Sequence, residues 1–182
     1  MNVRYTRLIT PDDAVPLTER LRENRDFLAP WDPARDDAFF TLDAQRDAIS
    51  QALEAHSRGA MVPLAIVDGD DRLIGRINVN GITRGAFQSA AIGYWVSRSH
   101  NGRGVATGAV AEAARLAFGE LGLHRLQAET LIHNTASQRV LTRNGFVPYG
   151  IAPQYLKIAG EWQDHILYQL LAPAPADGEL TA

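Results

Sequence analysis

The sequence predicts a single α/β domain whose central sheet is mixed but mostly antiparallel and is flanked by helices. Three observations predict this fold class. Apolar strand-like runs separated by turn residues fill residues 61–96. A strand–helix–strand pattern follows over residues 90–130, and such a unit forms a right-handed parallel crossover. Two further strand-like runs extend to residue 171, so we expect one domain over residues 1–171 and a disordered tail over residues 172–182.

Composition excludes several classes of protein. The 182 residues include no cysteine, so disulfides, thiolate metal sites and a cysteine nucleophile are ruled out. The five histidines lack the paired spacing of metal ligands, and no metal site is expected. A net charge of -3 argues against direct nucleic-acid binding. No apolar run approaches the ~20 residues of a membrane span, and the first residues do not resemble a signal peptide, so we expect a soluble, cytoplasmic protein with no membrane partner.

The first third of the chain predicts one strand and two helices. Residues Val3–Ile9 form the strand. Asp12 or Asp13 then caps a helix that ends near Asn24. Apolar residues at helical spacing predict the second helix over Leu42–Arg58, with a glycine directly after it as terminator.

The middle of the chain predicts an antiparallel meander. Met61–Val67 is a strand that ends in Asp68–Asp71, a hairpin signal. The partner strand returns over Leu73–Ile82. The chain turns again over Thr83–Phe87 and continues as the apolar strand Ala90–Val96.

The second half alternates helices and strands. A helix with a narrow, alanine-rich stripe is expected over Ala106–Leu121, because small residues let a helix lie close to a sheet. A strand follows over Leu123–Thr130, and a second helix over Asn134–Asn144. The closing pair of strands occupies Phe146–Leu171, with Gly160 in its turn.

Between the strand that ends at Val96 and the next helix lies a glycine-bearing turn, His100–Thr107. The first N–H groups of a helix lack intrahelical partners and carry the positive end of its dipole, so a phosphate is stabilised there. Gly102 and Gly104 allow close approach of backbone. The turn is neither a Walker loop nor a G-x-G-x-x-G loop, because Thr107 stands at the third glycine position. An ordinary strand-to-helix turn is the alternative interpretation.

The start of the second helix is the other candidate site. Asn134 and Ser137 stand at the N-cap and N3 positions, where a purely capping role is one interpretation. If the two crossover strands are neighbours, both helices begin at the same sheet edge, where ligands of open α/β sheets bind. Four arginines lie near these helix starts or along the second helix, where some are candidates for phosphate contacts: Arg98, Arg103, Arg139 and Arg143.

Three segments carry a family resemblance: residues 92–96 (IGYWV), 101–106 (NGRGVA) and 134–146 (NTASQRVLTRNGF). Together they resemble the GCN5-related N-acetyltransferases (GNAT), and within them the ribosomal-protein N-terminal acetyltransferases of the RimJ/RimL type. The resemblance spans about residues 3–171. Further matches favour the RimJ branch: Glu23–Arg25, Phe27–Leu28, Pro30–Trp31, Arg84–Gly85, His124–Arg125, Gly160, Trp162 and Asp164–His165.

The resemblance implies a GNAT-like fold in which the parallel strand pair forms the CoA cleft. It also implies where acetyl-CoA binds. Backbone N–H groups of one turn would hold its pyrophosphate: Asn101, Gly102, Arg103, Gly104, Val105, Ala106 and Thr107. Asn101 stands where the family usually has Gln or Arg. Tyr94, Trp95 and Val96 match the strand that pairs with the pantetheine arm, Asn134 matches a residue that hydrogen-bonds this arm, and Ser137 matches the serine that protonates the leaving thiolate.

Direct attack of an amine on a thioester requires alignment, oxyanion stabilisation, removal of a proton from the amine and protonation of sulfur. A backbone N–H near Val96 is the expected oxyanion donor. Many relatives place a glutamate base where this chain has Ala91. Glu129, at the end of the neighbouring strand, is the substitute candidate, acting through water, and an amine that arrives already neutral is the alternative.

The aromatic, proline-containing segment after the first helix has two compatible interpretations. Phe27, Leu28 and Trp31 either anchor a connecting segment on the core or form a wall of the acceptor pocket. In the second interpretation, Asp26, Trp31 and Asp32 contact the acceptor and the carboxylates attract its amine.

We therefore expect an acetyl-CoA-dependent N-acetyltransferase that needs no metal and acts on the α-amine of a protein or peptide, such as a ribosomal protein. The alternatives are acetylation of a small amine, such as a polyamine or aminoglycoside, and a non-catalytic CoA-binding regulatory or assembly module. The oligomeric state is open, with a homodimer among the alternatives.

Overall fold

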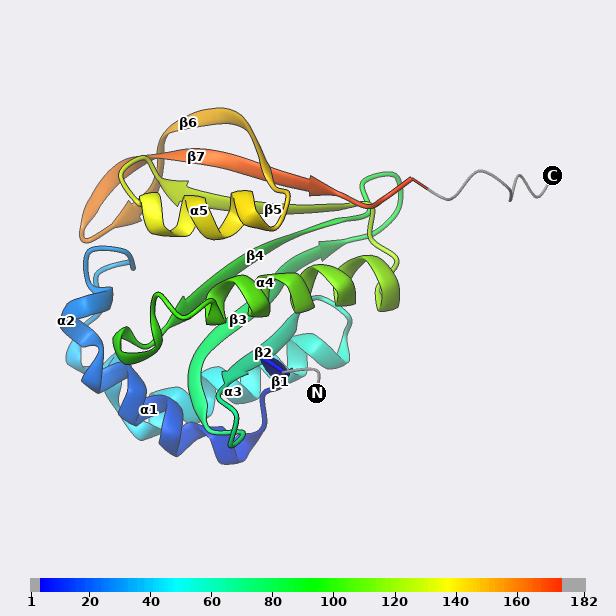
Figure 1. The fold of residues 1–182 in the computed structure, drawn as a ribbon. Coiled ribbons are helices and arrows are strands. Elements are labelled where there is room, and N and C mark those ends of the chain that lie inside the picture. The colour runs from blue at the N-terminus through cyan, green and yellow to red at the C-terminus, as the bar shows by residue number, and fades with distance from the viewer. Residues whose placement is uncertain (1–3, 175–182) are drawn as a thin grey trace.

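A computed structural model describes residues 4–174 (Figure 1). It contains one seven-stranded sheet in the order β1-β2-β3-β4-β5-β7-β6, with helices on both faces. All neighbouring strands are antiparallel except β4 and β5, which are parallel, so the predicted fold class and the crossover are confirmed. Apart from residues 172–174, the predicted tail lies outside the described residues. None of the helices in the described part is long and apolar enough to cross a membrane.

The seven strands are β1 (Thr6–Leu8), β2 (Val62–Val67), β3 (Leu73–Thr83), β4 (Ser89–Val96), β5 (Arg125–Leu131), β6 (Val147–Ile158) and β7 (Glu161–Leu171). The α-helices are α1 (Ala14–Glu23), α2 (Arg25–Leu28), α3 (Leu42–Ser57), α4 (Val105–Arg115) and α5 (Thr135–Arg143). Short 3-10 turns occupy Pro11–Asp13, Asp37–Phe40 and Arg98–His100.

Two predicted elements differ in extent from the observed ones. The first strand was expected over Val3–Ile9, but the strand spans Thr6–Leu8, with one further backbone hydrogen bond between β2 and each of Tyr5 and Ile9, and Val3 lies outside the described residues. The N–H of Tyr5 instead donates to the carboxylate of Glu112 on α4 at 3.0 Å. The helix expected to run to Leu121 ends its α-helical part at Arg115 and continues as a π-helical turn over Leu116–Glu120.

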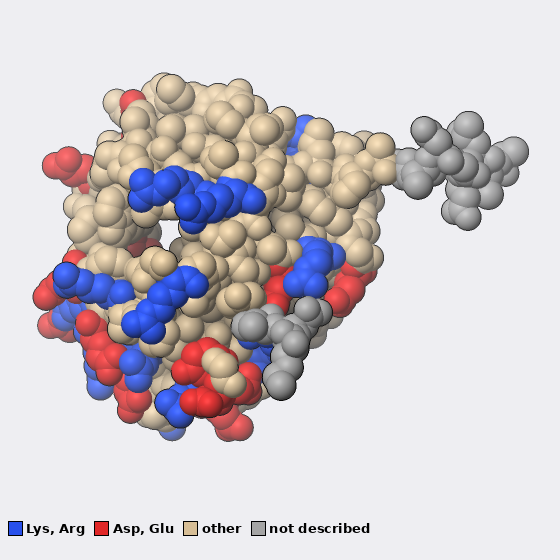
Figure 2. Space-filling model, in the orientation of Figure 1, with Lys and Arg blue, Asp and Glu red and all other residues tan. Residues whose placement is uncertain are grey.

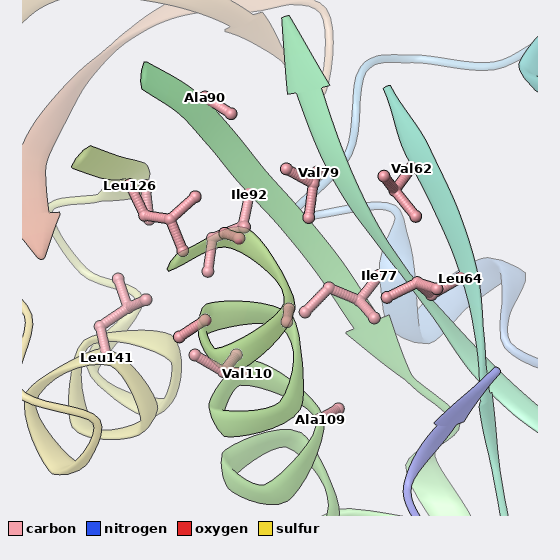
Figure 3. Close-up of a cluster of buried hydrophobic side chains, with 14 of the residues drawn as sticks. Val62, Leu64, Ile77, Val79, Ala90, Ile92, Ala109, Val110, Leu126 and Leu141 are labelled. Atoms are coloured by element: carbon pink, nitrogen blue, oxygen red, sulfur yellow. The ribbon is translucent and has the colours of Figure 1, made fainter. Parts of the chain in front are cut away.

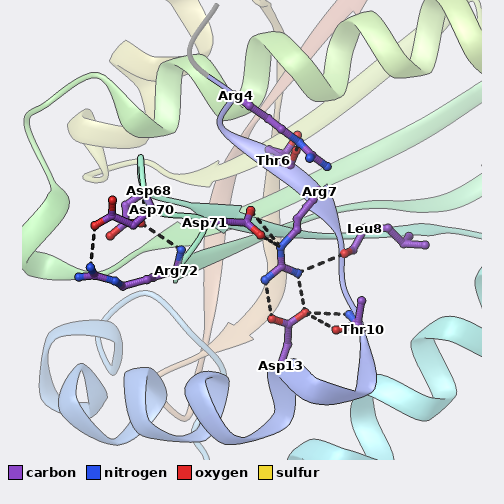
Figure 4. A network of polar contacts seen from close by, with 10 residues as sticks. All are labelled: Arg4, Thr6, Arg7, Leu8, Thr10, Asp13, Asp68, Asp70, Asp71 and Arg72. Carbon is purple, nitrogen blue, oxygen red and sulfur yellow. Dashed lines mark hydrogen bonds and ion pairs between the residues drawn. The ribbon is translucent and has the colours of Figure 1, made fainter.

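Asp13 does not cap α1 with its side chain, which corrects the expected capping role. Its carboxylate accepts two hydrogen bonds from the Arg7 guanidinium, at 2.7 and 2.8 Å, and one from the N–H of Thr10 at 2.8 Å. Arg7 also donates to Asp71 in the β2–β3 turn, so one guanidinium joins β1, α1 and that turn (Figure 4). Burial alone raises the pKa of Asp13, but its hydrogen bonds with Arg7 and Thr10 hold that pKa below its ordinary value.

Two hydrophobic clusters cover the two faces of the sheet. In the larger one, β3, β4 and β5 contribute Ile77, Ile92 and Leu126, which pack against Val110 of α4 and Leu141 of α5 (Figure 3). The buried stripe of α4 consists of small residues, as predicted, and this lets the helix lie close to the sheet. On the opposite face, α1 and α3 pack against β2 and β3 in the second cluster.

The parallel pair of strands separates in the middle of the sheet. Pairing between β4 and β5 runs only from Ser89–Arg125 to Ala91–Gln127, although β4 continues to Val96 and β5 to Leu131. The two strands diverge beyond that point, and α5 begins at the far end of β5 (Figure 1). Residues 92–96 therefore pair with β3 on one side and leave their other backbone edge open to the gap.

Candidate active site

Two cavities open on the gap between β4 and β5. The first, here called the sheet-face cavity, has a volume of about 520 Å³ and is lined by Arg76, Asn78 and Asn80 of β3 together with residues of α1, α3 and β5. The second, the helix-start cavity, has a volume of about 470 Å³ and is lined by the turn before α4 and the first turns of α4 and α5. Arg76 and Asn78 alternate along β3 with Ile77, which packs on the α4 side, so the sheet-face cavity lies mainly on the α1 and α3 side of the sheet and the helix-start cavity on the α4 and α5 side.

Six residues line both cavities, and we call this set the junction: Leu28, Trp31, Tyr94, Trp95, Asn134 and Ser137. They come from the segment around α2, from β4 and from the start of α5. These side chains therefore mark the place where the two cavities adjoin. The sequence-predicted strand residues Tyr94 and Trp95 and the predicted helix residues Asn134 and Ser137 are thus brought together.

The polar centre of the junction is a pair of hydroxyl groups. The Tyr94 hydroxyl lies 2.8 Å from Ser137 Oγ, and either oxygen can be the donor. Burial raises the pKa of Tyr94 to about 12, although its hydrogen bond with Ser137 acts in the opposite direction. Tyr94 is therefore neutral near pH 7 and supplies a proton to a hydrogen bond.

Asn134 holds the start of α5 in place. Its Oδ1 accepts from the N–H of Ser137 at 3.1 Å, which confirms the predicted N-cap arrangement. The cap orients Ser137 toward the junction, so the capping and cavity-lining interpretations of this pair are compatible. A direct contact between Asn134 and a ligand stays a prediction.

The turn before α4 has the backbone that an anion site requires. Gly102 and Gly104 have positive φ values of 76° and 80°, and Gly104 is the N-cap. The first hydrogen bond of the helix is from Gly108 N–H to Gly104, so the N–H groups of Val105–Thr107 have no intrahelical acceptor. All predicted turn residues from Asn101 to Thr107 line the helix-start cavity except Arg103, which is exposed.

Basic side chains surround the helix-start cavity. Arg139 and Arg143 of α5 and His100 of the preceding turn line it. Figure 2 shows a hollow toward one side of the molecule, with Lys and Arg side chains above and below it. Positive charge and free N–H groups therefore meet at one place, which suits a phosphate-bearing ligand.

Asn24 positions this turn from a distance of more than 70 residues along the chain. Its Oδ1 accepts from the N–H of Arg98 at 2.8 Å, and its Nδ2 donates to Ser97 Oγ at 3.4 Å and to the Arg20 carbonyl oxygen at 2.8 Å. It is a buried asparagine at the end of α1. The sequence identified it as a helix end and as part of the resemblance at Glu23–Arg25, but not as a residue that holds this turn; the available signal was a polar residue on the apolar face of that helix.

The sheet-face cavity contains both acidic and basic groups. Glu129 of β5 lines it, and burial raises the pKa of that carboxyl above its ordinary value. Arg76 lines it from β3 and donates from Nε to Asn78 Oδ1 at 3.1 Å. Thr130 also lines it, and its Oγ1 is the one fully buried side-chain atom in residues 4–174 that lacks a hydrogen-bond partner. Neither Arg76 nor Thr130 was singled out from the sequence.

The predicted acceptor residues separate into two groups. Trp31 lines both cavities and its ring lies 5.5 Å from that of His133, while Asp32 lines the sheet-face cavity and pairs with Arg35 at 3.1 Å. Asp26 is exposed on α2 and lines neither cavity. Leu28 packs against the cluster beneath α1 and α3, as the anchoring interpretation predicts, whereas Trp31 is exposed and belongs to the cavity wall.

Comparison with known proteins gives a consistent result. The family described as acetyltransferase (GNAT) domain matches residues 5–147. Probable N-acetyltransferase YjcK of Bacillus subtilis is 38% identical over 170 residues, which are 93% of this chain and 94% of that protein. [Ribosomal protein uS5]-alanine N-acetyltransferase of Escherichia coli is 33% identical over 168 residues, 92% of this chain and 87% of that protein.

Among solved structures, Mycobacterium smegmatis RimJ in complex with CoA-disulfide superimposes with a TM-score of 0.88 at 31% sequence identity, over 92% of this chain and 81% of that chain. Relatives named as N-acetyltransferases thus match almost the whole chain. This chain belongs to the GNAT family and is an N-acetyltransferase of the RimJ/RimL type.

Proposed function

We propose that this enzyme transfers the acetyl group of acetyl-CoA to the N-terminal α-amine of a protein, such as a ribosomal protein, by direct attack of the amine on the thioester. The observation that carries the proposal is the junction, where a cavity suited to a phosphate-bearing ligand meets a second cavity on the opposite side of the sheet. Support for the acceptor comes from the relatives named for ribosomal-protein acetylation.

The helix-start cavity fits the phosphates of acetyl-CoA. It is lined by Val105–Thr107, whose backbone N–H groups have no intrahelical acceptor, together with Arg139 and Arg143. We propose that Tyr94–Val96 bind the pantetheine arm, because their open strand edge offers hydrogen bonds to its amides in the way an added strand would.

The direction of the Val96 peptide suits an oxyanion donor. The N–H of Ser97 donates to Ile74 of β3, at 2.8 Å. Successive residues of a strand point their N–H groups to opposite sides, so the N–H of Val96 is directed away from β3 and into the gap. We propose that it stabilises the negative charge that forms on the thioester oxygen.

Two groups move the protons. Glu129 takes the proton from the attacking nitrogen, through a water molecule, and its raised pKa makes it a stronger base than an ordinary glutamate. Ser137 gives a proton to the thiolate as the carbon–sulfur bond breaks, while Tyr94 donates to Ser137 Oγ. Delivery of an already neutral amine remains the alternative to Glu129.

The acceptor enters through the sheet-face cavity, with Trp31 and Asp32 forming part of its wall. Asp26 has no part in this arrangement, because it lines neither cavity. A homodimer stays a prediction.

The test is an acetylation assay on an array of peptides with free N-termini, scored by thiol release and by the mass of the product, beside a panel of polyamines and aminoglycosides. Matched peptides with a blocked N-terminus and an internal lysine are the control. We expect turnover that requires the free α-amine. Small-amine turnover without peptide turnover contradicts the acceptor, and CoA binding without thiol release from any amine contradicts catalysis.

A further inference from the structure

Arg76 presents a guanidinium with unused donors to the sheet-face cavity. Its side chain is half-buried, and only Nε donates to a protein group, Asn78 Oδ1. The two Nη atoms have no hydrogen-bond partner in residues 4–174, and they are not among the fully buried polar atoms. They are therefore open to the cavity that Arg76 lines.

The charges around Arg76 leave it without a carboxylate partner. Of the acidic residues that line the same cavity, Asp32 is paired with Arg35 at 3.1 Å. Glu129 lies on β5, and in the described part of the chain no ion pair joins it, or any other carboxylate, to Arg76. Holding a partly desolvated cation without a partner costs free energy, and a bound anion would recover it.

Arg76 also lies close to the place of transfer. It is the direct cross-strand partner of Trp95, a junction residue, and Asn78 is the partner of Gly93. Such partners have Cβ atoms about 5 Å apart. An acceptor whose amine reaches the junction therefore passes within reach of the guanidinium after only a few covalent bonds.

We propose that Arg76, oriented by Asn78, forms a carboxylate-binding subsite, so that the enzyme prefers acceptors with an acidic side chain within the first few residues after the attacking α-amine. The inference rests on the proposed function and specifies its substrate class. A guanidinium binds a carboxylate through two parallel hydrogen bonds, which fixes both distance and orientation.

The arrangement of charge in the cavity fits such an acceptor. The amine is directed to the junction, in the cavity that Glu129 of β5 also lines, and the carboxylate is directed to Arg76 on β3. A polyamine has no group to neutralise Arg76 and adds positive charge beside it. The subsite thus favours peptides over small polycations.

The test uses alanine-initiated peptides, amidated at the C-terminus, that differ only by Glu or Gln at the second, third or fourth position. We expect wild-type kcat/KM to favour Glu over Gln by about tenfold or more at one of these positions. In Arg76→Met the ratio falls to within about twofold of unity, while turnover of the Gln peptide and CoA binding are kept. Arg76→Lys keeps the charge without the two-pronged geometry, and we expect an intermediate ratio.

Outcomes that overturn the inference are distinct from failure of the proposed function. No Glu preference in the wild type, or an unchanged preference in Arg76→Met, overturns the subsite. Thermal melting shows whether Arg76→Met folds. If this variant does not fold, an equal ratio of kcat/KM for the Glu and Gln peptides in wild type and Arg76→Lys overturns the subsite. Dipeptides with free or amidated C-termini test an α-carboxylate as the source. If free-acid dipeptides alone are turned over, and their turnover depends on Arg76, then Arg76 binds a carboxylate but not one from a side chain. That result overturns both the acidic side chain and the protein acceptor.

Discussion

Replacing Ser137 with alanine tests the chemistry of the junction with little effect on the fold. The N-cap of α5 uses the backbone N–H of Ser137 and the side chain of Asn134, so it survives the substitution. The variant loses the hydroxyl that lies 2.8 Å from the Tyr94 hydroxyl. We expect thermal stability and CoA affinity close to those of the wild type, and a lower rate of the chemical step.

The size of the effect follows from the charge on the leaving group. A hydrogen bond to a charged group contributes about 1.5–3 kcal/mol. Because 1.36 kcal/mol corresponds to a factor of ten, kcat of Ser137→Ala should fall by about 10- to 150-fold. Tyr94→Phe removes only the donor to Ser137 and should lower kcat less. The double variant should be no slower than Ser137→Ala, because Tyr94 acts through Ser137.

The assay is steady-state and single-turnover thiol release at saturating acetyl-CoA, with CoA affinity measured by calorimetry. The pKa of Tyr94, about 12, keeps its hydroxyl protonated, so the ratio of wild-type to Tyr94→Phe rates should not change with pH between about 6 and 9. A large loss in Tyr94→Phe with near-normal Ser137→Ala would refute the proposed order and make Tyr94 the direct proton donor. If the two single variants lose kcat equally and the losses add in the double variant, Tyr94 does not act through Ser137.

Three further changes test the base, the sheet and the N-terminal network. Glu129→Gln should lower kcat/KM by about 10- to 100-fold and remove the acidic limb of the pH–rate profile. The raised pKa of Glu129 places this limb above the ordinary glutamate range. A limb that persists in the variant contradicts the role of Glu129 as the base. Gly75→Ala puts a Cβ 2.3 Å from the Trp95 carbonyl oxygen and should lower the free energy of unfolding, measured in urea, by about 1–3 kcal/mol. Gly93→Ala, whose Cβ has its nearest contact at 3.9 Å, is the matched control. Equal losses of stability in the two variants contradict this reasoning. Asp13 has a lowered pKa, so the stability that it contributes is complete above the ordinary aspartate pKa and is lost as pH falls through the folded-state pKa. The difference in melting temperature between wild type and Asp13→Asn should therefore shrink below about pH 4. A difference that does not change with pH contradicts this.

Local signals in the sequence were enough for most of the fold. The aspartate-rich turn Asp68–Asp71 predicts the β2–β3 hairpin, because a hairpin turn is formed by residues adjacent in the chain. The right-handed crossover rule brought the starts of α4 and α5 to one edge of the sheet, and with them Asn134 and Ser137. Family resemblance then supplied the chemical roles that spacing alone leaves open.

What the sequence did not reveal depends on partners far away in the chain. Asn24 reads as a helix end, and only the folded chain shows that it bonds Ser97 and Arg98. Arg76 occupies a strand whose alternation is satisfied by any polar residue, so its lack of a carboxylate partner is visible only in three dimensions. Asp12 or Asp13 was expected to cap α1, but the carboxylate of Asp13 accepts two hydrogen bonds from Arg7 instead.

The separation of β4 and β5 also depends on contacts between segments that are far apart in the chain. Pairing stops after Ala91 and Gln127, and the one local signal nearby is Gly93 of β4, because β5 contains neither glycine nor proline. Each strand is still bonded on its other side, to β3 and to β7. The gap is thus a property of the whole sheet, which a window of local sequence does not encode.

The most direct test of the account is the crystal structure of this protein with a bisubstrate analogue, in which the sulfur of CoA is joined by an acetyl-sized linker to the α-amine of an alanine-initiated peptide. We predict that the pyrophosphate lies at the start of α4 and that the linker passes between β4 and β5. Its sulfur should contact the Ser137 hydroxyl, and the peptide should occupy the sheet-face cavity. A pyrophosphate bound elsewhere, or a peptide that leaves on the same side of the sheet as CoA, would contradict the two-cavity arrangement.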